Sequence, residues 1–101
     1  HVLQGIEVYN GKQIVYSMGN FCFGGNKNPS DKDSMIFQQT FTLQDGVIQG
    51  YDDFKIIPCR LSSVTNVNDY QPTILDGDEA QRVMDKIREI SRELSVEPWE
   101  F

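Results

Sequence analysis

The sequence predicts an α+β fold made of two β-hairpins, with about four mainly antiparallel strands, and one amphipathic helix near the C-terminus. Two dipeptides that favour type I′ turns, Asn10-Gly11 and Asp45-Gly46, each separate two segments rich in β-branched and aromatic residues. An apolar stripe with helical spacing follows between residues 80 and 94. The length of 101 residues suits one domain, so residues 1–101 are taken as a single unit.

The first hairpin is predicted over residues 2–23, with Asn10-Gly11 at its turn. A two-residue loop sets the facing pairs along this hairpin: Ile6 with Val15, Leu3 with Met18, and His1 with Asn20. Both faces of its second strand are apolar, so we expect this strand to be central in the sheet and covered on both sides. Segment 24–33 is rich in Gly, Asn, Pro, Ser and Asp, which is typical of an exposed loop.

The second hairpin is predicted from residues 35–43, which alternate apolar and polar side chains, and from residues 47–57, which return after Asp45-Gly46. A two-residue turn predicts four facing pairs: Leu43 with Ile48, Phe41 with Gly50, Phe37 with Phe54, and Met35 with Ile56. This register puts the large apolar side chains on one face, which the helix can cover. Pro58 lacks a backbone N–H, so we expect it to end the ladder or to lie at a sheet edge.

The helix is predicted after an irregular connection over residues 60–72. Asp76 and Glu79 match a capping-box pattern, in which the Asp side chain caps the first turn. The apolar stripe that should face the sheet consists of Ala80, Val83, Met84, Ile87, Ile90 and Leu94.

The remaining helix surface is charged and is expected to face solvent. Ion pairs three residues apart are expected there, between Arg82 and Asp85 and between Lys86 and Glu89. Pro98 bars further helix, and the aromatic residues Trp99 and Phe101 are expected to anchor the C-terminus on the sheet or on a partner.

Composition excludes several classes of function. Nine Lys and Arg residues against fifteen Asp and Glu residues give a net charge of −6, which disfavours binding to nucleic acid or to an anionic membrane surface. The single histidine excludes a metal site or a mechanism that needs a pair of histidines from this chain alone. No apolar run approaches the length of a membrane span.

Few residues offer reactive chemistry. His1 is the one imidazole, and it is interpreted as a metal ligand, a base, an exposed bystander or the remnant of a tag. Asn20 is a polar residue that needs partners where it is buried. Cys22 and Cys59 allow a disulfide by count, although we favour two small buried thiols. The paired carboxylates at residues 52 and 53 point to opposite faces of a strand and so cannot share a proton.

The first 24 residues, HVLQGIEVYNGKQIVYSMGNFCFG, resemble the C-terminal part of bacterial capsule-synthesis proteins of the poly-γ-glutamate (CapA/PgsA-like) family. The family pattern V-(L/V)-Q-x-I-E, then N-G-K, then I-x-Y-S-(L/M)-G-N-F-x-F runs through this stretch without a gap. The later NPSDKDSMIFQQTF is also similar, so the resemblance extends over about residues 1–60. It implies that the two hairpins and the helix are part of a larger metallophosphoesterase-like β-sandwich, and that the chain is a piece of a longer protein.

The resemblance also implies a site. His1 matches the second histidine of the family's Gly-x-His-x-His motif, which supplies metal ligands, and Gln4, Glu7 and Asn20 are the candidate site-lining residues. The other ligands lie upstream in the family. We therefore expect no catalytic residue and no cofactor in this chain alone, and divalent metal ions of the Mn, Fe or Zn type in the parent protein.

The expected partners are the remainder of the parent chain and a second copy of this chain, bound through an exposed strand. The parent would act at the bacterial cell surface in association with the membrane, while this portion is itself soluble. The alternative is a noncatalytic interaction or assembly module whose hairpins supply a sheet for a partner.

Overall fold

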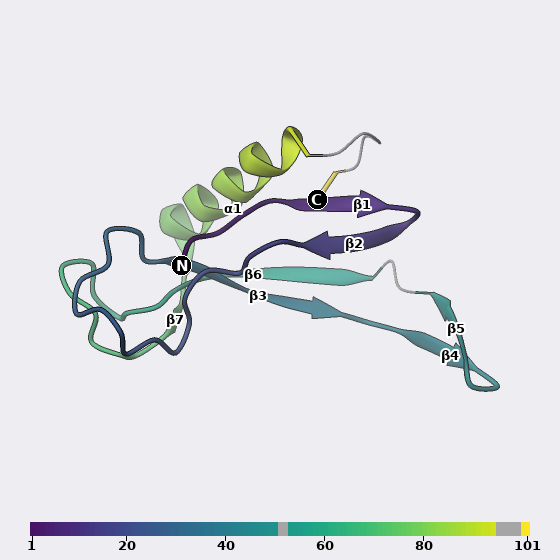
Figure 1. Ribbon diagram of the computed structural model, residues 1–101, viewed down its shortest axis with the longest axis horizontal. Helices are drawn as coiled ribbons and strands as arrows, with labels where there is room; N and C mark the ends of the chain where they lie inside the picture. Colours follow the sequence, from purple (N-terminus) through teal and green to yellow (C-terminus); the bar gives the residue numbers. More distant parts are fainter. Residues whose placement is uncertain (51–52, 95–99) are drawn as a thin grey trace.

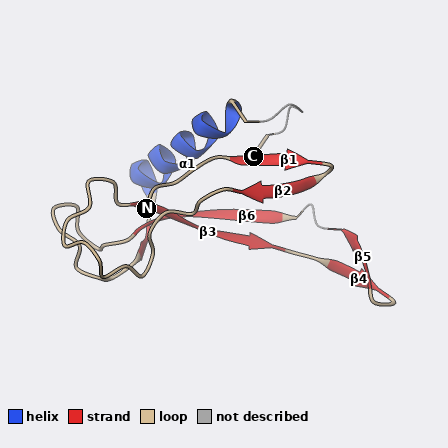
Figure 2. Ribbon diagram, viewed as in Figure 1, coloured by secondary structure: helices blue, strands red, loops and turns tan. Residues whose placement is uncertain are grey.

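The computed structural model describes residues 1–50, 53–94 and 100–101, and it has the predicted α+β class: antiparallel strands in small sheets and one helix (Figure 1). The elements in chain order are β1 (Ile6–Tyr9), β2 (Lys12–Val15), β3 (Asp33–Gln39), β4 (Thr42–Gln44), β5 (Val47–Gly50), β6 (Phe54–Arg60), β7 (Thr73–Ile74) and α1 (Gly77–Arg92). The loops gather at one end of the molecule, where the helix begins (Figure 2). In the described part of the chain, no helix is both long and apolar enough to cross a membrane.

The first hairpin forms in the predicted register. Asn10 and Gly11 have φ of 50° and 73°, as a type I′ turn requires, and Ile6 pairs with Val15. Leu3 and Met18 form an isolated bridge further along. The expectation that the second strand is central is wrong, because β2 pairs with β1 alone among the described strands. Several apolar side chains of this segment are half exposed instead: Ile14, Tyr16, Met18 and Phe21.

The second hairpin has the predicted register at its tip and a different one at its base. Leu43 pairs with Ile48 as expected, but a bulge after Thr42 makes Thr42, and not Phe41, the partner of Gly50. In the long ladder of β3 and β6, two further corrections follow: Phe37 pairs with Ile56 and not with Phe54, and Met35 pairs with Pro58 and not with Ile56. The total shift is two residues.

A shift of two residues leaves every side chain on its predicted face, because successive side chains alternate across a strand. The rings of Phe37 and Phe54 therefore still stack, with their centroids 5.6 Å apart. Phe41 lies beyond the bulge, and 55% of its surface is exposed, so it does not join the face that the helix covers.

Pro58 does not end the ladder, because β6 continues through it to Arg60. The Pro58 carbonyl oxygen accepts a hydrogen bond from the Leu75 N–H at 2.9 Å, so the polar backbone side of this residue faces β7 and not β3. On that side β7 pairs with Cys59 and Arg60 only, and the missing N–H of Pro58 leaves the β3–β6 ladder intact.

Helix α1 lies across β6 and β1 and buries most of the predicted stripe, but Leu94 lies beyond the end of the helix and is 37% exposed. Val83 and Ile87 are fully buried in a core with Leu3, Ile6, Met35 and Leu75. Asp76 occupies the N-cap position, but its side chain makes no capping hydrogen bond, so that part of the capping-box prediction is wrong. Ser91, which is 3% exposed, also lies on the buried face of the helix and was not predicted there.

The C-terminus is anchored on the sheet through an aromatic ring. The Phe101 ring packs edge-on against Phe54, with centroids 6.4 Å apart, as expected for an anchor on the sheet. Trp99 lies outside the described residues, as does Asp52.

Both cysteines are free thiols, and Cys59 is buried. Cys22 is exposed, contrary to expectation, because the chain has left the hairpin at this point.

Candidate functional site

The loop end of the first hairpin brings two of the predicted site residues together. Gly19 has φ of +73°, and a Cβ atom there would stand 2.6 Å from the Asp33 carbonyl oxygen, so only glycine fits this close approach to β3. The turn at Gly19 directs Asn20 back to the chain start, where its Nδ2 atom donates a long hydrogen bond of 3.4 Å to the His1 carbonyl oxygen. The predicted pair of His1 and Asn20 is thus joined by a hydrogen bond from the Asn20 side chain and not by pairing between strands.

A cavity of about 370 Å³ opens beside these two residues. His1 is exposed on its wall, with its ring tilted against Phe23 at 5.3 Å between centroids. Asn20 and Asp31 also line this cavity, which we call the His1 cavity. It therefore presents an imidazole, a carboxamide and a carboxylate.

The other two predicted residues lie elsewhere. Gln4 lines a separate, mainly apolar cavity beside Ile90 and Leu94. Glu7 lies on β1, and its Oε1 atom accepts a 2.8 Å hydrogen bond from the Tyr16 hydroxyl, which raises the pKa of Tyr16. The structure therefore groups His1 with Asn20 and keeps Gln4 and Glu7 apart from them, and a functional role for any of the four stays a prediction.

The donor set does not amount to a metal centre. Across the described ranges, no three His, Cys, Asp or Glu side chains are close enough to share an ion. Asp31 is already engaged, since its Oδ2 accepts from Lys86 Nζ at 2.8 Å and its Oδ1 accepts from the Asp33 N–H at 3.0 Å. A catalytic metal needs at least about three protein ligands, so His1 would have to combine with ligands from other chain segments.

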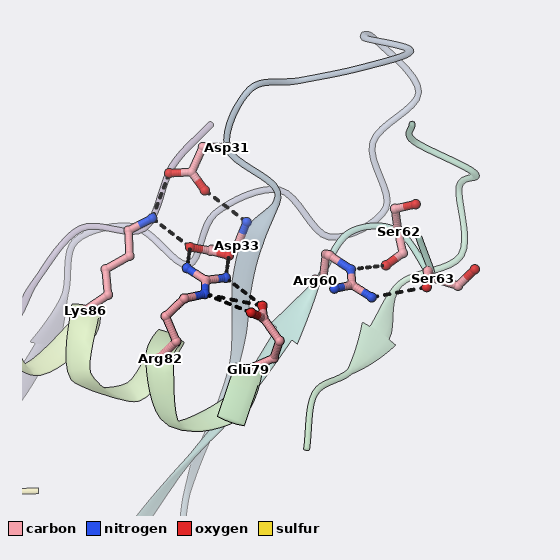
Figure 3. A network of polar contacts seen from close by, with 8 residues as sticks. All are labelled: Asp31, Asp33, Arg60, Ser62, Ser63, Glu79, Arg82 and Lys86. Atoms are coloured by element: carbon pink, nitrogen blue, oxygen red, sulfur yellow. Dashed lines mark hydrogen bonds and ion pairs between the residues drawn. The ribbon is translucent and has the colours of Figure 1, made fainter. Parts of the chain in front are cut away.

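A charged network lies next to the His1 cavity and was not predicted (Figure 3). Asp33 is 6% exposed and stands where β3 begins, beneath α1. Its Oδ1 accepts from Arg82 Nη2 at 2.7 Å, and its Oδ2 accepts from Arg82 Nη1 at 3.0 Å and from Lys86 Nζ at 2.8 Å. Burial by itself raises the pKa of Asp33, but these bonds outweigh it and lower the pKa below its ordinary value of 3.8.

The pKa values of the two cations that bind Asp33 are raised. Hydrogen bonds that Arg82 donates to Asp33 and Glu79 raise the pKa of Arg82, and the aspartates 31 and 33 raise the pKa of Lys86 against the effect of its partial burial. The expected pairs of Arg82 with Asp85 and of Lys86 with Glu89 are therefore wrong. Asp33 attracts both cations because it is buried and fixed at the start of a strand, and Arg82 also keeps a helix partner in Glu79. The sequence held a signal for these contacts. Arg82 and Lys86 are four residues apart on one helix face, and each stands next to a buried position, 83 or 87.

Asn68 joins the two long loops at this end of the molecule, and Asp69 holds loop 61–72 together from within. The buried Asn68 donates from Nδ2 to the carbonyl oxygens of Phe23 at 2.8 Å and Asn26 at 3.1 Å, which ties loop 61–72 to loop 24–32. Asp69 accepts hydrogen bonds from the hydroxyl and the N–H of Ser63, which lower its pKa to about 2. These contacts fix the loops that form the walls of the cavities.

The comparisons with known proteins concern the first hairpin. Residues 1–25 match the family model described as bacterial capsule synthesis protein PGA_cap, which is about a quarter of the chain. The expected resemblance is supported over those residues, while its extension towards residue 60 rests on the sequence motifs alone. No curated protein and no solved structure matches this chain. The matched residues contain β1, β2 and the turn that carries Asn20, so this chain is similar to the capsule-synthesis family in the segment that forms one part of the His1 cavity wall.

Proposed function

We propose that this chain is the C-terminal structural portion of a protein for poly-γ-glutamate capsule biosynthesis with a metallophosphoesterase-like fold, acting at the bacterial cell surface. The observation that supports this proposal most is that the 25 matched residues coincide with the hairpin that joins His1 to Asn20. His1 supplies one ligand of a divalent metal centre, and segments of the parent protein outside this sequence supply the others.

This proposal predicts different results for the chain and for the parent protein. The chain alone should show no stoichiometric binding of Mn²⁺ or Zn²⁺ at micromolar concentration in a calorimetric titration, because one imidazole is too few ligands. The parent should hydrolyse a phosphoester only with metal present, and His1→Ala should abolish both the activity and the bound metal.

Gln71→Ala is the control, because Gln71 is exposed and does not line the His1 cavity. A parent protein that retains its metal and its activity after His1→Ala would contradict the proposed role of His1. Micromolar stoichiometric metal binding by the chain alone would contradict the need for further ligands.

A second candidate is a noncatalytic assembly module that associates with another copy of itself. The observation that favours it is apolar exposure along β4 and β5, where Leu43, Val47 and Ile48 are 63%, 59% and 50% exposed. Exposed apolar strands with free edges are surfaces on which other strands pair.

Sedimentation velocity tests this second candidate. We expect the sedimentation coefficient to rise with concentration, and Leu43→Lys to suppress the rise. Gln44→Lys on the same strand adds the same charge at a polar position and should leave the association unchanged. A sedimentation profile that stays monomeric at high concentration would exclude the module.

A further inference from the structure

A second cavity, of about 380 Å³, lies between loop 24–32, the start of β3, the end of β6 and the first turns of α1. Four cationic side chains line it, Lys32, Arg60, Arg82 and Lys86, against three carboxylates, Asp31, Asp33 and Glu79. The local charge is therefore 4 − 3 = +1, in a protein whose net charge is −6. We call this space the cationic cavity.

All three carboxylates form ion pairs with the two helix cations that line the cavity, Arg82 and Lys86. Asp33 binds Arg82 and Lys86, as described above. Asp31 binds Lys86 at 2.8 Å, and Glu79 binds Arg82 at 3.0 Å. The carboxylates thus neutralise Arg82 and Lys86, and no carboxylate remains to neutralise the other two cations.

Lys32 and Arg60 are held by carbonyl oxygens. Lys32 Nζ donates to the Pro29 carbonyl oxygen at 2.7 Å. Arg60 donates from Nε to Ser62 O at 2.9 Å and from Nη2 to Ser63 O at 3.1 Å (Figure 3). Neither cation has a carboxylate within salt-bridge distance in the part of the chain that the structure describes. A carbonyl dipole orients a cation without cancelling its charge, so both retain a full positive charge toward the cavity.

The free donors favour a tetrahedral oxyanion over a carboxylate. Two serine carbonyls occupy the Nε–Nη2 edge of Arg60, which leaves its Nη1–Nη2 edge for two oxygens of a ligand. The remaining Lys32 protons and the hydroxyls of Ser30 and Thr65 add donors on the same cavity wall, more than the two oxygens of one carboxylate can use. Donors that approach from several directions suit a group with three or four oxygens.

We propose that the cationic cavity binds a phosphoryl group, either as free phosphate or as a phosphate monoester. Lys32 and Arg60 supply the charge, and Ser30 and Thr65 supply neutral donors. The site shares Ser30 and Asp31 with the His1 cavity, so a ligand larger than phosphate would reach from one cavity into the other. Binding requires no metal and so does not depend on the proposed role of His1.

The test is a titration of the ¹⁵N-labelled chain with sodium phosphate, followed by amide chemical shifts. EDTA is present throughout, and sodium chloride keeps the ionic strength constant, because screening alone moves shifts in a charged region. We expect saturable shifts at residues 30–33 and 60–65. Arg60→Gln and Lys32→Gln should each weaken binding about tenfold, which is the scale of one lost charge-assisted hydrogen bond.

Arg92→Gln is the matched control, since it removes one positive charge from an exposed ion pair on α1 that does not line the cavity, and it should leave the affinity unchanged. Glutarate, a dicarboxylate, should bind much more weakly than phosphate. Phenyl phosphate separates the two sources: binding at least as tight as phosphate assigns the site to an ester, and weaker binding assigns it to free phosphate.

Three results would overturn the proposal. The first is the absence of saturable shifts in the wild-type chain. The second is glutarate binding as tight as that of phosphate. The third is an equal loss of affinity in Arg92→Gln and Arg60→Gln, which would indicate a general charge effect. Preserved dispersion of the amide spectrum verifies that each variant is folded.

Discussion

Asp33 is the one charged side chain that is buried among the described residues, and it is the point where β3, loop 24–32 and α1 meet. A buried carboxylate without partners is strongly unfavourable, so the fold depends on the two cations that approach it from the helix. Arg82 and Lys86 retain 49% and 32% of their side-chain exposure, so water screens part of their attraction. Their contribution to stability is therefore that of strong hydrogen bonds and not that of a dry ion pair.

Asp33→Asn should lower the free energy of unfolding at pH 7 by about 2 kcal/mol, since an amide cannot accept as many charge-assisted bonds. The pKa of Asp33 is lower in the folded chain than its ordinary value of 3.8. This stabilisation is therefore complete above about pH 4 and is lost as the pH falls through the folded-state pKa. Urea unfolding of both proteins at pH 7 and near pH 2 measures the difference, which should shrink in acid. A penalty that is the same at both pH values would contradict this account.

The two thiols should differ in reactivity toward a thiol reagent. Cys22 is exposed, while Cys59 is fully buried in β6, and burial raises the pKa of its thiol. In the native state we expect one thiol per chain to react rapidly with Ellman's reagent, and two after unfolding in urea. Cys22→Ser should remove the rapid phase. Rapid reaction of two thiols in the folded protein would show that β6 is accessible.

At the scale of elements, α1 is held by more than its apolar stripe. Ser91 Oγ accepts a 2.9 Å hydrogen bond from the Ile6 N–H of β1 and donates to the Ile87 carbonyl oxygen at 2.5 Å. The Ser91 hydroxyl, on the buried face of α1, thus accepts a hydrogen bond from an N–H on the side of β1 that faces away from β2. Close packing reinforces this contact, because a Cβ atom on Gly5 would stand 2.8 Å from the Ile90 carbonyl oxygen.

Ser91→Ala should destabilise the protein by about 1–3 kcal/mol, because the buried Ile6 N–H would lose its acceptor. Amide hydrogen exchange locates the effect: the Ile6 amide should exchange much faster in the variant than in the wild type. Ser30→Ala, at an exposed loop position, is the control for a lost hydroxyl. If exchange at Ile6 stayed unchanged, Ser91 would not be its partner in solution.

At the scale of the whole molecule, the chain is elongated. Its radius of gyration is 15.2 Å and its extents are 47 × 31 × 26 Å, whereas a compact domain of this length has a radius of gyration of about 13 Å. The excess comes from the β4–β5 hairpin, which projects from the end opposite the loops (Figure 1). Its side chains are exposed and partly apolar, so this arm carries much of the surface available to a partner.

Small-angle scattering at low concentration should give a radius of gyration of about 15 Å with the forward scattering of an 11.6 kDa monomer. The two quantities must be read together, because association raises both. A monomeric mass with a radius of gyration near 13 Å, the compact value for this length, would mean that the arm packs back onto the body.

The elements that local sequence signals specify could be predicted before the structure was known. Asn10-Gly11 and Asp45-Gly46 placed both turns, because few residues adopt positive φ without strain. The 3.6-residue period placed the helix, and its buried stripe followed. Of the candidate site, the motif around the first hairpin singled out His1 and Asn20, which the structure brings to one cavity.

The tertiary structure alone decided what depends on contacts between distant segments. The ladder of β3 and β6 is shifted by two residues from the register that the turn predicts, and a bulge after Thr42 begins this shift. Arg82 and Lys86 both bind Asp33, which lies 49 and 53 residues away in the chain, although Arg82 also keeps its helix neighbour Glu79. Local patterns cannot report such pairs, because the depth of burial that gives Asp33 its strength exists only after the helix has docked.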